Sequence, residues 1–130
     1  MIGMAASVRS DFSKVRRRAR SAQIESLGHA GAAIRLVARR SIRRSPRASA
    51  PGHAPHTRRG QLKRAVLYAV EKARQSVVIG PAYQMIGLSA TAHEFGGRYR
   101  RGRYPKRSFM GPALEKTRDR LPRFWAGSVR

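Results

Sequence analysis

The sequence predicts an α+β fold, in which a long N-terminal helix, a small antiparallel β-sheet and one or two further helices pack together. Three observations predict it. Apolar residues recur at steps of three and four across residues 10–43, as in an amphipathic helix. Two short runs rich in β-branched residues lie within residues 65–80, separated by a polar stretch. The chain has 130 residues, too few to divide into two domains with proper cores, so residues 1–130 are expected to form a single domain.

The first element is a helix over residues 10–43. Ser10 is its expected N-cap, and Asp11 suits the positive end of the helix dipole. Gly28 and Gly31 weaken its centre by about 1 kcal/mol each relative to Ala. They mark either a break into two helices or a place where another backbone comes close. The apolar stripe consists of Phe12, Val15, Ala19, Ala22, Leu27, Gly31, Ile34, Ala38 and Ile42.

Residues 45–60 follow as a loop that contains Pro46, Pro51 and Pro55. It is expected to be extended and exposed. A connection of this length is long for a compact domain, and such loops are usually functional or ordered by a partner.

Residues 65–80 are predicted to form a β-hairpin, because AVLYAVE and SVVIG are strand-like and KARQ supplies a polar turn. Residues 83–95 are predicted to form a second helix that stops at Gly96 and Gly97. Its apolar positions at helical spacing are Met85, Leu88, Ala92 and Phe95.

Residues 98–107 are too basic for a core strand and are expected to form a hairpin or a mobile loop. A last helix is predicted to start near Pro112, a residue suited to a first helical turn. Pro122 should bend or end it near Leu121. Its expected apolar face is Leu114, Thr117, Leu121 and Trp125.

The charge is large and unevenly distributed. The chain has 29 Lys and Arg against six Asp and Glu, a net charge of +23. Residues 1–64 carry a net +14 and residues 98–130 a net +9, whereas residues 65–97 are neutral. Because self-repulsion at this charge opposes compaction, the chain is expected to meet an electronegative partner such as nucleic acid or an acidic protein.

The sequence carries no pattern typical of an enzyme, a metal site or a cofactor site. His53 and His56 lie in the proline-rich loop, where His-x-x-His fixes no geometry for zinc. The only acidic residue next to a histidine is Glu94, which follows His93. Nucleophilic catalysis therefore has little support. Six scattered carboxylates do not suggest two-metal nuclease chemistry. We therefore expect a non-catalytic protein without a cofactor.

The chain is also expected to work away from membranes and oxidising compartments. Its longest nearly uncharged run, residues 75–92, contains Gly, Pro and Gln and is shorter than a membrane span. The N-terminus lacks a signal-peptide pattern. With no cysteine, disulfides are excluded, and assembly in a cytoplasm is expected.

Basic side chains interleaved with aromatic ones are the candidate contacts with DNA or with a protein partner. Cations suit phosphate contact, and tyrosines add possible stacking on bases. The alternative is a solvated edge hairpin whose arginines prevent aggregation. The candidates are Arg58, Arg59, Arg98, Tyr99, Arg100, Arg101, Arg103, Tyr104, Lys106 and Arg107.

Four ordered segments resemble the head–tail joining (tail-completion, or neck) family of lambda-like long-tailed bacteriophages. They are PGHAPHTRRGQLKRAV at 51–66, VIGP at 78–81, AHEFGG at 92–97 and PKRSFMGPALE at 105–115. Together they cover about half of the chain. The first, third and fourth segments are similar to that family's Gly-x-Leu-Arg, Glu-Phe-Gly and Pro-Ala-Leu elements. The second is similar to its element at the end of a strand. The basicity of Arg58, Arg59 and residues 98–107 departs from the family pattern.

The resemblance implies a structural virion protein that forms a ring of roughly six or twelve copies in the neck, assembled in the host cytoplasm. It implies neighbours such as a portal-side adaptor or head-closure ring, a tail terminator or the tail tube, and DNA passing through the lumen. Its motif residues are expected to be scaffold: Gly60 frees the backbone, and Phe95 is expected to plug the core. The scaffold candidates are Gly60, Leu62, Val66, Phe95, Gly96, Phe109 and Leu114.

Two alternatives stay open at this point. A tail terminator, which caps the tail tube, also forms a ring, and the sequence does not separate the two roles. A free nucleic-acid-binding protein would show affinity that falls steeply with salt.

Overall fold

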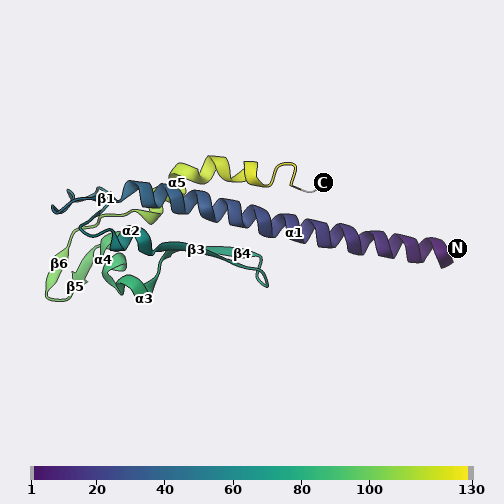
Figure 1. Cartoon of the computed structure of the whole chain (residues 1–130), viewed down its shortest axis with the longest axis horizontal. Helices are drawn as coiled ribbons and strands as arrows, with labels where there is room; N and C mark the ends of the chain where they lie inside the picture. The colour runs from purple at the N-terminus through teal and green to yellow at the C-terminus, as the bar shows by residue number, and fades with distance from the viewer. Residues whose placement is uncertain (1, 129–130) are drawn as a thin grey trace.

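The spine of the molecule is a single long helix. The computed structural model describes residues 2–128, with side chains from Phe12 onward. Helix α1 (Ile2–Ser41) has 40 residues and is therefore about 60 Å long at 1.5 Å per residue. Its N-terminal part extends away from the remaining elements, which gather around its C-terminal half (Figure 1). The helix is continuous through residue 10, so the expected N-cap at Ser10 is wrong.

A β-hairpin packs on one side of this spine. Strands β3 (Val66–Glu71) and β4 (Ser76–Pro81) pair antiparallel from Val66 opposite Pro81 to Glu71 opposite Ser76, which confirms the predicted hairpin. A Cβ on Gly31 would lie 2.7 Å from Val77 Cγ2 and 2.9 Å from Tyr68 Cδ2. Gly31 therefore does not break the helix; it makes room for the side chains of the hairpin.

The other side of α1 is covered by the C-terminal helices. Helix α5 (Met110–Thr117) begins two residues before the predicted start at Pro112. It passes into the 3₁₀ helix η1 (Arg118–Phe124), so the change of winding comes at Arg118 and not at Leu121. In Figure 1 the C-terminal helices and the hairpin lie on opposite sides of α1.

The proline-rich segment is less exposed than predicted. Ser49, Pro55 and Thr57 are buried, although most of residues 45–60 is exposed. Strand β2 (His56–Thr57) pairs in parallel with β1 (Arg43–Arg44), directly after the spine helix. Gly52 N also donates to the carbonyl of Lys106, at 2.9 Å. The segment is thus tied to the body at both of these points.

The residues between the hairpin strands and the C-terminus form short elements. Helix α2 (Gln61–Ala65) leads into the hairpin from Gly60, whose φ of 78° is in the left-handed region, as expected of that glycine. The single helix predicted over 83–95 is wrong, because Gly87 at φ 57° separates α3 (Tyr83–Ile86) from α4 (Ser89–Phe95). Strands β5 (Gly97–Tyr99) and β6 (Gly102–Tyr104) form the hairpin expected in the basic segment.

The core lies where α1, α2, α4 and α5 meet. Across residues 2–128 the strands form three separate two-stranded ladders, so the sheet content is small and the core is mostly helical. None of the helices in that part of the chain is long and apolar enough to cross a membrane. The central cluster of buried side chains is Ile34, Ala38, Ile42, Leu62, Val66, Ala90, Phe109 and Ala113.

Candidate functional site

The four segments that carry the family resemblance meet in one joint. Leu62 and Val66, from the first segment, belong to the same buried cluster as Phe109 and Ala113 from the fourth. These four side chains are at most 7 % exposed, as expected of Leu62, Val66 and Phe109. Burial of large apolar side chains stabilises a fold by about 1.5–3 kcal/mol each. The first and last segments are therefore joined by core packing.

The third segment joins the fourth through one carboxylate. Glu94 Oε2 accepts hydrogen bonds from the N–H groups of Phe109 at 2.9 Å and Met110 at 3.0 Å. Glu94 Oε1 accepts a third from the N–H of Gly111, also at 2.9 Å. The first N–H groups of a helix have no partner within it, and the helix dipole favours an anion there. Glu94 thus caps α5 from a different helix.

Gly96 lets this joint close. Its φ is 71°, and a Cβ there would lie 3.0 Å from Lys106 N and 3.2 Å from the carbonyl oxygen of Tyr104. Beside it, Arg107 N donates to the carbonyl of His93 at 2.7 Å. A side chain at position 96 would meet backbone on the far side, so the predicted role of Gly96 as the helix stop is confirmed, with close approach as a second reason for glycine.

His93 sits half-buried at the edge of the joint. Burial lowers its pKa from 6.5, and the positive charge of Arg107 lowers it further. The Nδ1 atom of His93 and the hydroxyl of Ser49 are both buried without a hydrogen-bond partner. Arg107 Nε donates to the carbonyl of Ser49 at 2.9 Å. Arg107, one of the predicted partner contacts, is half-buried and links the joint to the proline-rich segment.

The second segment completes the joint. Ile79 packs against the buried cluster, and Pro81 pairs with Val66 across the hairpin. The next residue, Ala82, donates its N–H to the carbonyl of Ala65 at 2.9 Å. All four segments are thereby in contact with one another or with the same core.

The opposite side of α3 and α4 is apolar and uncovered. Phe95 is 72 % exposed, so the prediction that it plugs the core is wrong. Ala90 belongs to the buried cluster and Glu94, one turn further along α4, binds the start of α5, whereas the Phe95 side chain is exposed to solvent. We call this surface the outer face; it consists of Tyr83, Met85, Leu88 and Phe95, each more than half exposed.

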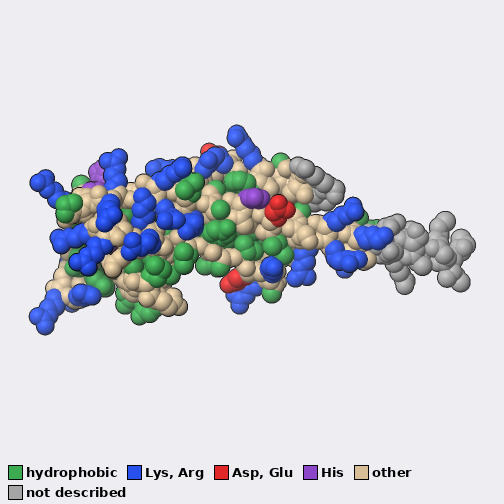
Figure 2. Space-filling model, in the orientation of Figure 1, with side chains coloured by type: hydrophobic (Ala, Val, Ile, Leu, Met, Phe, Trp, Pro, Cys, Tyr) green, Lys and Arg blue, Asp and Glu red, His purple; other side chains and the backbone are tan. Residues whose placement is uncertain are grey.

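The outer face lies in the part of the sequence with the fewest charges. Residues 75–97 contain no Lys or Arg, and Glu94 is their only acidic residue. In Figure 2 hydrophobic side chains gather over α3 and α4, while Lys and Arg cover much of the surface nearby. The prediction that Leu114 belongs to the buried scaffold is also wrong, because its side chain on α5 is 47 % exposed.

The β5–β6 hairpin presents most of the predicted basic contacts. Arg98, Arg100, Arg101 and Arg103 are exposed and line an open hollow of about 730 Å³. The rings of Tyr99 and Tyr104 meet edge to face with centroids 5.7 Å apart. Arg100 Cζ lies 5.4 Å from the centroid of Tyr99. Cations next to paired rings can contact phosphates and stack on planar groups.

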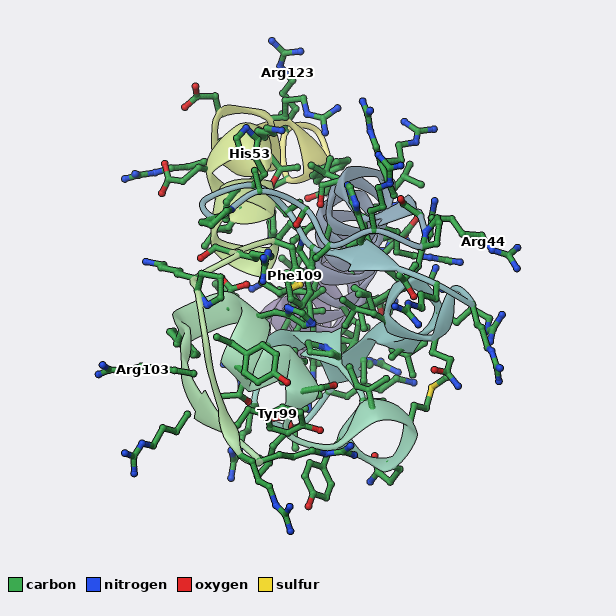
Figure 3. The ribbon with its side chains drawn as sticks, turned by 90° about the vertical axis from the view of Figure 1, so that its left-hand side faces the viewer. Arg44, His53, Tyr99, Arg103, Phe109 and Arg123 are labelled. Carbon is green, nitrogen blue, oxygen red and sulfur yellow. The ribbon has the colours of Figure 1, made fainter. Side chains whose placement is uncertain are left out.

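Arg58 and Arg59 are exposed elsewhere at the same end of the molecule. Arg44 Nε donates to the carbonyl of Arg58 at 3.2 Å, so these arginines lie close to Arg44. Figure 3, which looks onto this end, shows Arg44 and Arg103 projecting on different sides. Lys106 is exposed beside the β5–β6 hairpin. The structure therefore brings the predicted basic residues to one end, but as two groups and not as one site.

Sequence reasoning missed the role of Glu94, because its partners lie 15 to 17 residues further along the chain and no local pattern announces them. It also missed Arg44, one of the cations that follow the spine helix. Within the described side chains, no three His, Asp or Glu residues gather as metal ligands would.

Comparison with known proteins adds no assignment. No family model matches the sequence, and no curated protein and no solved structure is significantly similar to the chain.

Proposed function

We propose that the chain is a structural subunit of the neck of a long-tailed phage, where copies of it form a ring that joins head to tail. The observation that carries this proposal is the joint itself. The four segments that resemble the head–tail joining family converge on one core, and the Glu94 carboxylate binds the N-terminus of α5. A shared scaffold role would account for the order and spacing of these four segments.

The outer face supports contact between copies. Two copies of a chain with a net charge of +23 repel each other over most of their surfaces. The face formed by Tyr83, Met85, Leu88 and Phe95 is apolar, so repulsion opposes contact there less than on surfaces covered by Lys and Arg. Large exposed apolar patches commonly mark interaction sites.

The basic end supports contact with acidic neighbours. In a ring that DNA traverses, arginines of the β5–β6 hairpin would face phosphates or an acidic surface of the adjoining ring. Head–tail joining and tail termination both require a subunit that forms a ring. The proposal therefore includes the tail-terminator role as a variant.

A free nucleic-acid-binding protein is the second candidate, and the exposed arginines around Tyr99 and Tyr104 favour it. The two functions differ in what the isolated chain does. A neck subunit forms a ring and binds duplex DNA weakly. A free DNA-binding protein stays monomeric, and its log affinity falls with log salt at a slope near −0.9 per neutralised phosphate.

Native mass spectrometry combined with a salt titration of DNA binding tests the proposal. We expect a closed ring stoichiometry and weak binding to a duplex oligonucleotide. A monomer that binds the duplex with a steep salt slope, and loses that slope when Arg100, Arg101 and Arg103 are replaced by Gln, would contradict the neck function. All three arginines are exposed, so this triple variant is expected to fold normally.

A further inference from the structure

The N-terminal half of α1 leaves an apolar stripe uncovered. Phe12 is 68 % exposed and Val15 58 % exposed, whereas Ala22 is buried. Steps of three and four residues place Phe12, Val15, Ala19 and Ala22 on one face of the helix. We call these four residues the α1 stripe. It begins outside the body of the molecule and ends inside it (Figure 1).

The stripe runs into a groove of about 980 Å³. The groove lies between α1 and the C-terminal segment, and Ala22, Ser26 and Phe124 are among its lining residues. Its far wall is held in place by hydrogen bonds. Ser26 Oγ donates to the carbonyl of Phe124 at 2.7 Å, and Trp125 Nε1 donates to Gln23 Oε1 at 2.8 Å. The ring of His29 stacks on Phe124 with centroids 6.3 Å apart. The groove is therefore a fixed feature of the surface.

Cations border both the stripe and the groove. Lys14, Arg17 and Arg18 line the groove, and among the side chains that the structure describes, Glu25 is its only acidic lining residue. Residues 14–20 include five cations and no acidic residue. An exposed apolar stripe with cations on its flanks is complementary to a segment that offers apolar side chains on one face and carboxylates beside them.

We propose that the α1 stripe and the adjoining groove bind an acidic amphipathic helix of another protein. The apolar side chains of that helix would cover Phe12 and Val15, and its carboxylates would meet Lys14, Arg17 and Arg18. This proposal does not depend on the neck function and uses a different surface from the outer face.

Other occupants fit the same surface less well. A second copy of the chain has six acidic residues against 29 basic ones, and Glu25, Glu71, Glu94 and Glu115 already have partners within the fold. Nucleic acid supplies phosphates but offers little to cover Phe12 and Val15. An anionic membrane would match the stripe but not the rigid wall at Phe124 and Trp125.

The test uses a labelled synthetic helical peptide of about twenty residues, with Leu at helical spacing on one face and Glu elsewhere. A second peptide has the same composition in scrambled order, so its charge is the same but it has no apolar face. Binding to the full chain is measured by fluorescence anisotropy. We expect the patterned peptide to bind at least about tenfold more tightly than the scrambled one.

Three variants locate the site, two of which form a matched pair. Phe12→Ser with Val15→Ser leaves the charge unchanged and should remove the preference for the patterned peptide. Replacing Lys14, Arg17 and Arg18 by Gln should weaken binding about tenfold or more, whereas replacing Arg98, Arg101 and Arg103 removes as much charge and should change it less than threefold. All these side chains are exposed, so unchanged unfolding curves are expected and serve as the control for folding.

Three results would overturn the proposal. The first is equal binding of both peptides, which would mean attraction by net charge alone. The second is an equal loss in both cation variants. The third is tighter binding to a duplex oligonucleotide or to phosphatidylserine vesicles that is lost in the Phe12→Ser, Val15→Ser variant, which would assign the stripe to nucleic acid or to a membrane.

Discussion

Glu94 and Phe95 are neighbours in α4, yet their side chains have different surroundings. Glu94 binds three backbone N–H groups at the start of α5, those of Phe109, Met110 and Gly111, and Phe95 is 72 % exposed. Glu94 belongs to a hydrogen-bonded joint, and Phe95 belongs to the apolar outer face. A short motif can thus hold a fold together with one residue and offer an interaction surface with the next. The comparison predicts that changes in the joint and on the outer face will have different consequences.

The largest expected difference is between two phenylalanines. Phe109 is 1 % exposed, so Phe109→Ala should lower the free energy of unfolding by about 3–5 kcal/mol through the cavity that it leaves. Phe95→Ala should change the unfolding free energy of the subunit by less than about 0.5 kcal/mol. Denaturant titration at a concentration where the chain is monomeric checks both. Equal losses would contradict the different surroundings of the buried joint and the outer face.

The Glu94 cap should come next in size. Glu94→Gln keeps the shape of the side chain but removes the negative charge that accepts three hydrogen bonds. We expect a loss of about 1–3 kcal/mol, measured by denaturant titration. Glu115→Gln is the matched control, because Glu115 is exposed and lies 4.0 Å from Arg118. If both variants lose equally little, the cap does not hold α4 and α5 together.

The contact between α1 and the hairpin can be tested with two glycines. A Cβ on Gly31 would lie 2.7 Å from Val77 Cγ2, so Gly31→Ala should destabilise the chain by about 1–2 kcal/mol. The nearest atom to a Cβ on Gly28 is Val70 Cγ2 at 3.9 Å. Gly28→Ala should therefore stabilise the helix by up to about 1 kcal/mol. Thermal unfolding of the two variants should show melting temperatures shifted in opposite directions.

The smallest expected effect is the pH dependence that His93 contributes. Burial and Arg107 lower the pKa of His93 in the folded chain, so the unfolded chain binds more protons as the pH falls below 6.5. Stability should consequently decrease as the pH falls through this region. His93→Gln should flatten the slope of the unfolding free energy against pH just below 6.5. A slope that His93→Gln leaves unchanged would contradict this account.

Local patterns were enough to predict most elements but not their surroundings. Periodicity predicted the spine helix, the β3–β4 hairpin and the last helix, because each depends on neighbouring residues in the chain. The orientation of α4 depends on which side packs against α5, and Phe95 looks like a core residue until that is known. Likewise, the burial of Pro55 depends on the pairing of β2 with β1, and the role of Glu94 on N–H groups far along the chain.

In the candidate site, too, the surroundings of some residues could be predicted from the sequence and those of others could not. The basic residues of the β5–β6 hairpin could be predicted from composition, because Arg side chains in a short polar hairpin are exposed in most folds. The inward orientation of Arg107 could not be predicted, since its partner is the backbone carbonyl of Ser49. The exposure of the outer face could not be predicted either, because apolar residues at helical spacing are usually buried.

The central claim is that copies of the chain meet through the outer face, and sedimentation velocity of three proteins tests it most directly. We predict that the unmodified chain and the Phe12→Ser variant sediment as the same oligomer, whereas Phe95→Ser sediments as a folded monomer. A monomeric unmodified chain, or an oligomer that survives Phe95→Ser and dissociates with Phe12→Ser, would contradict the account.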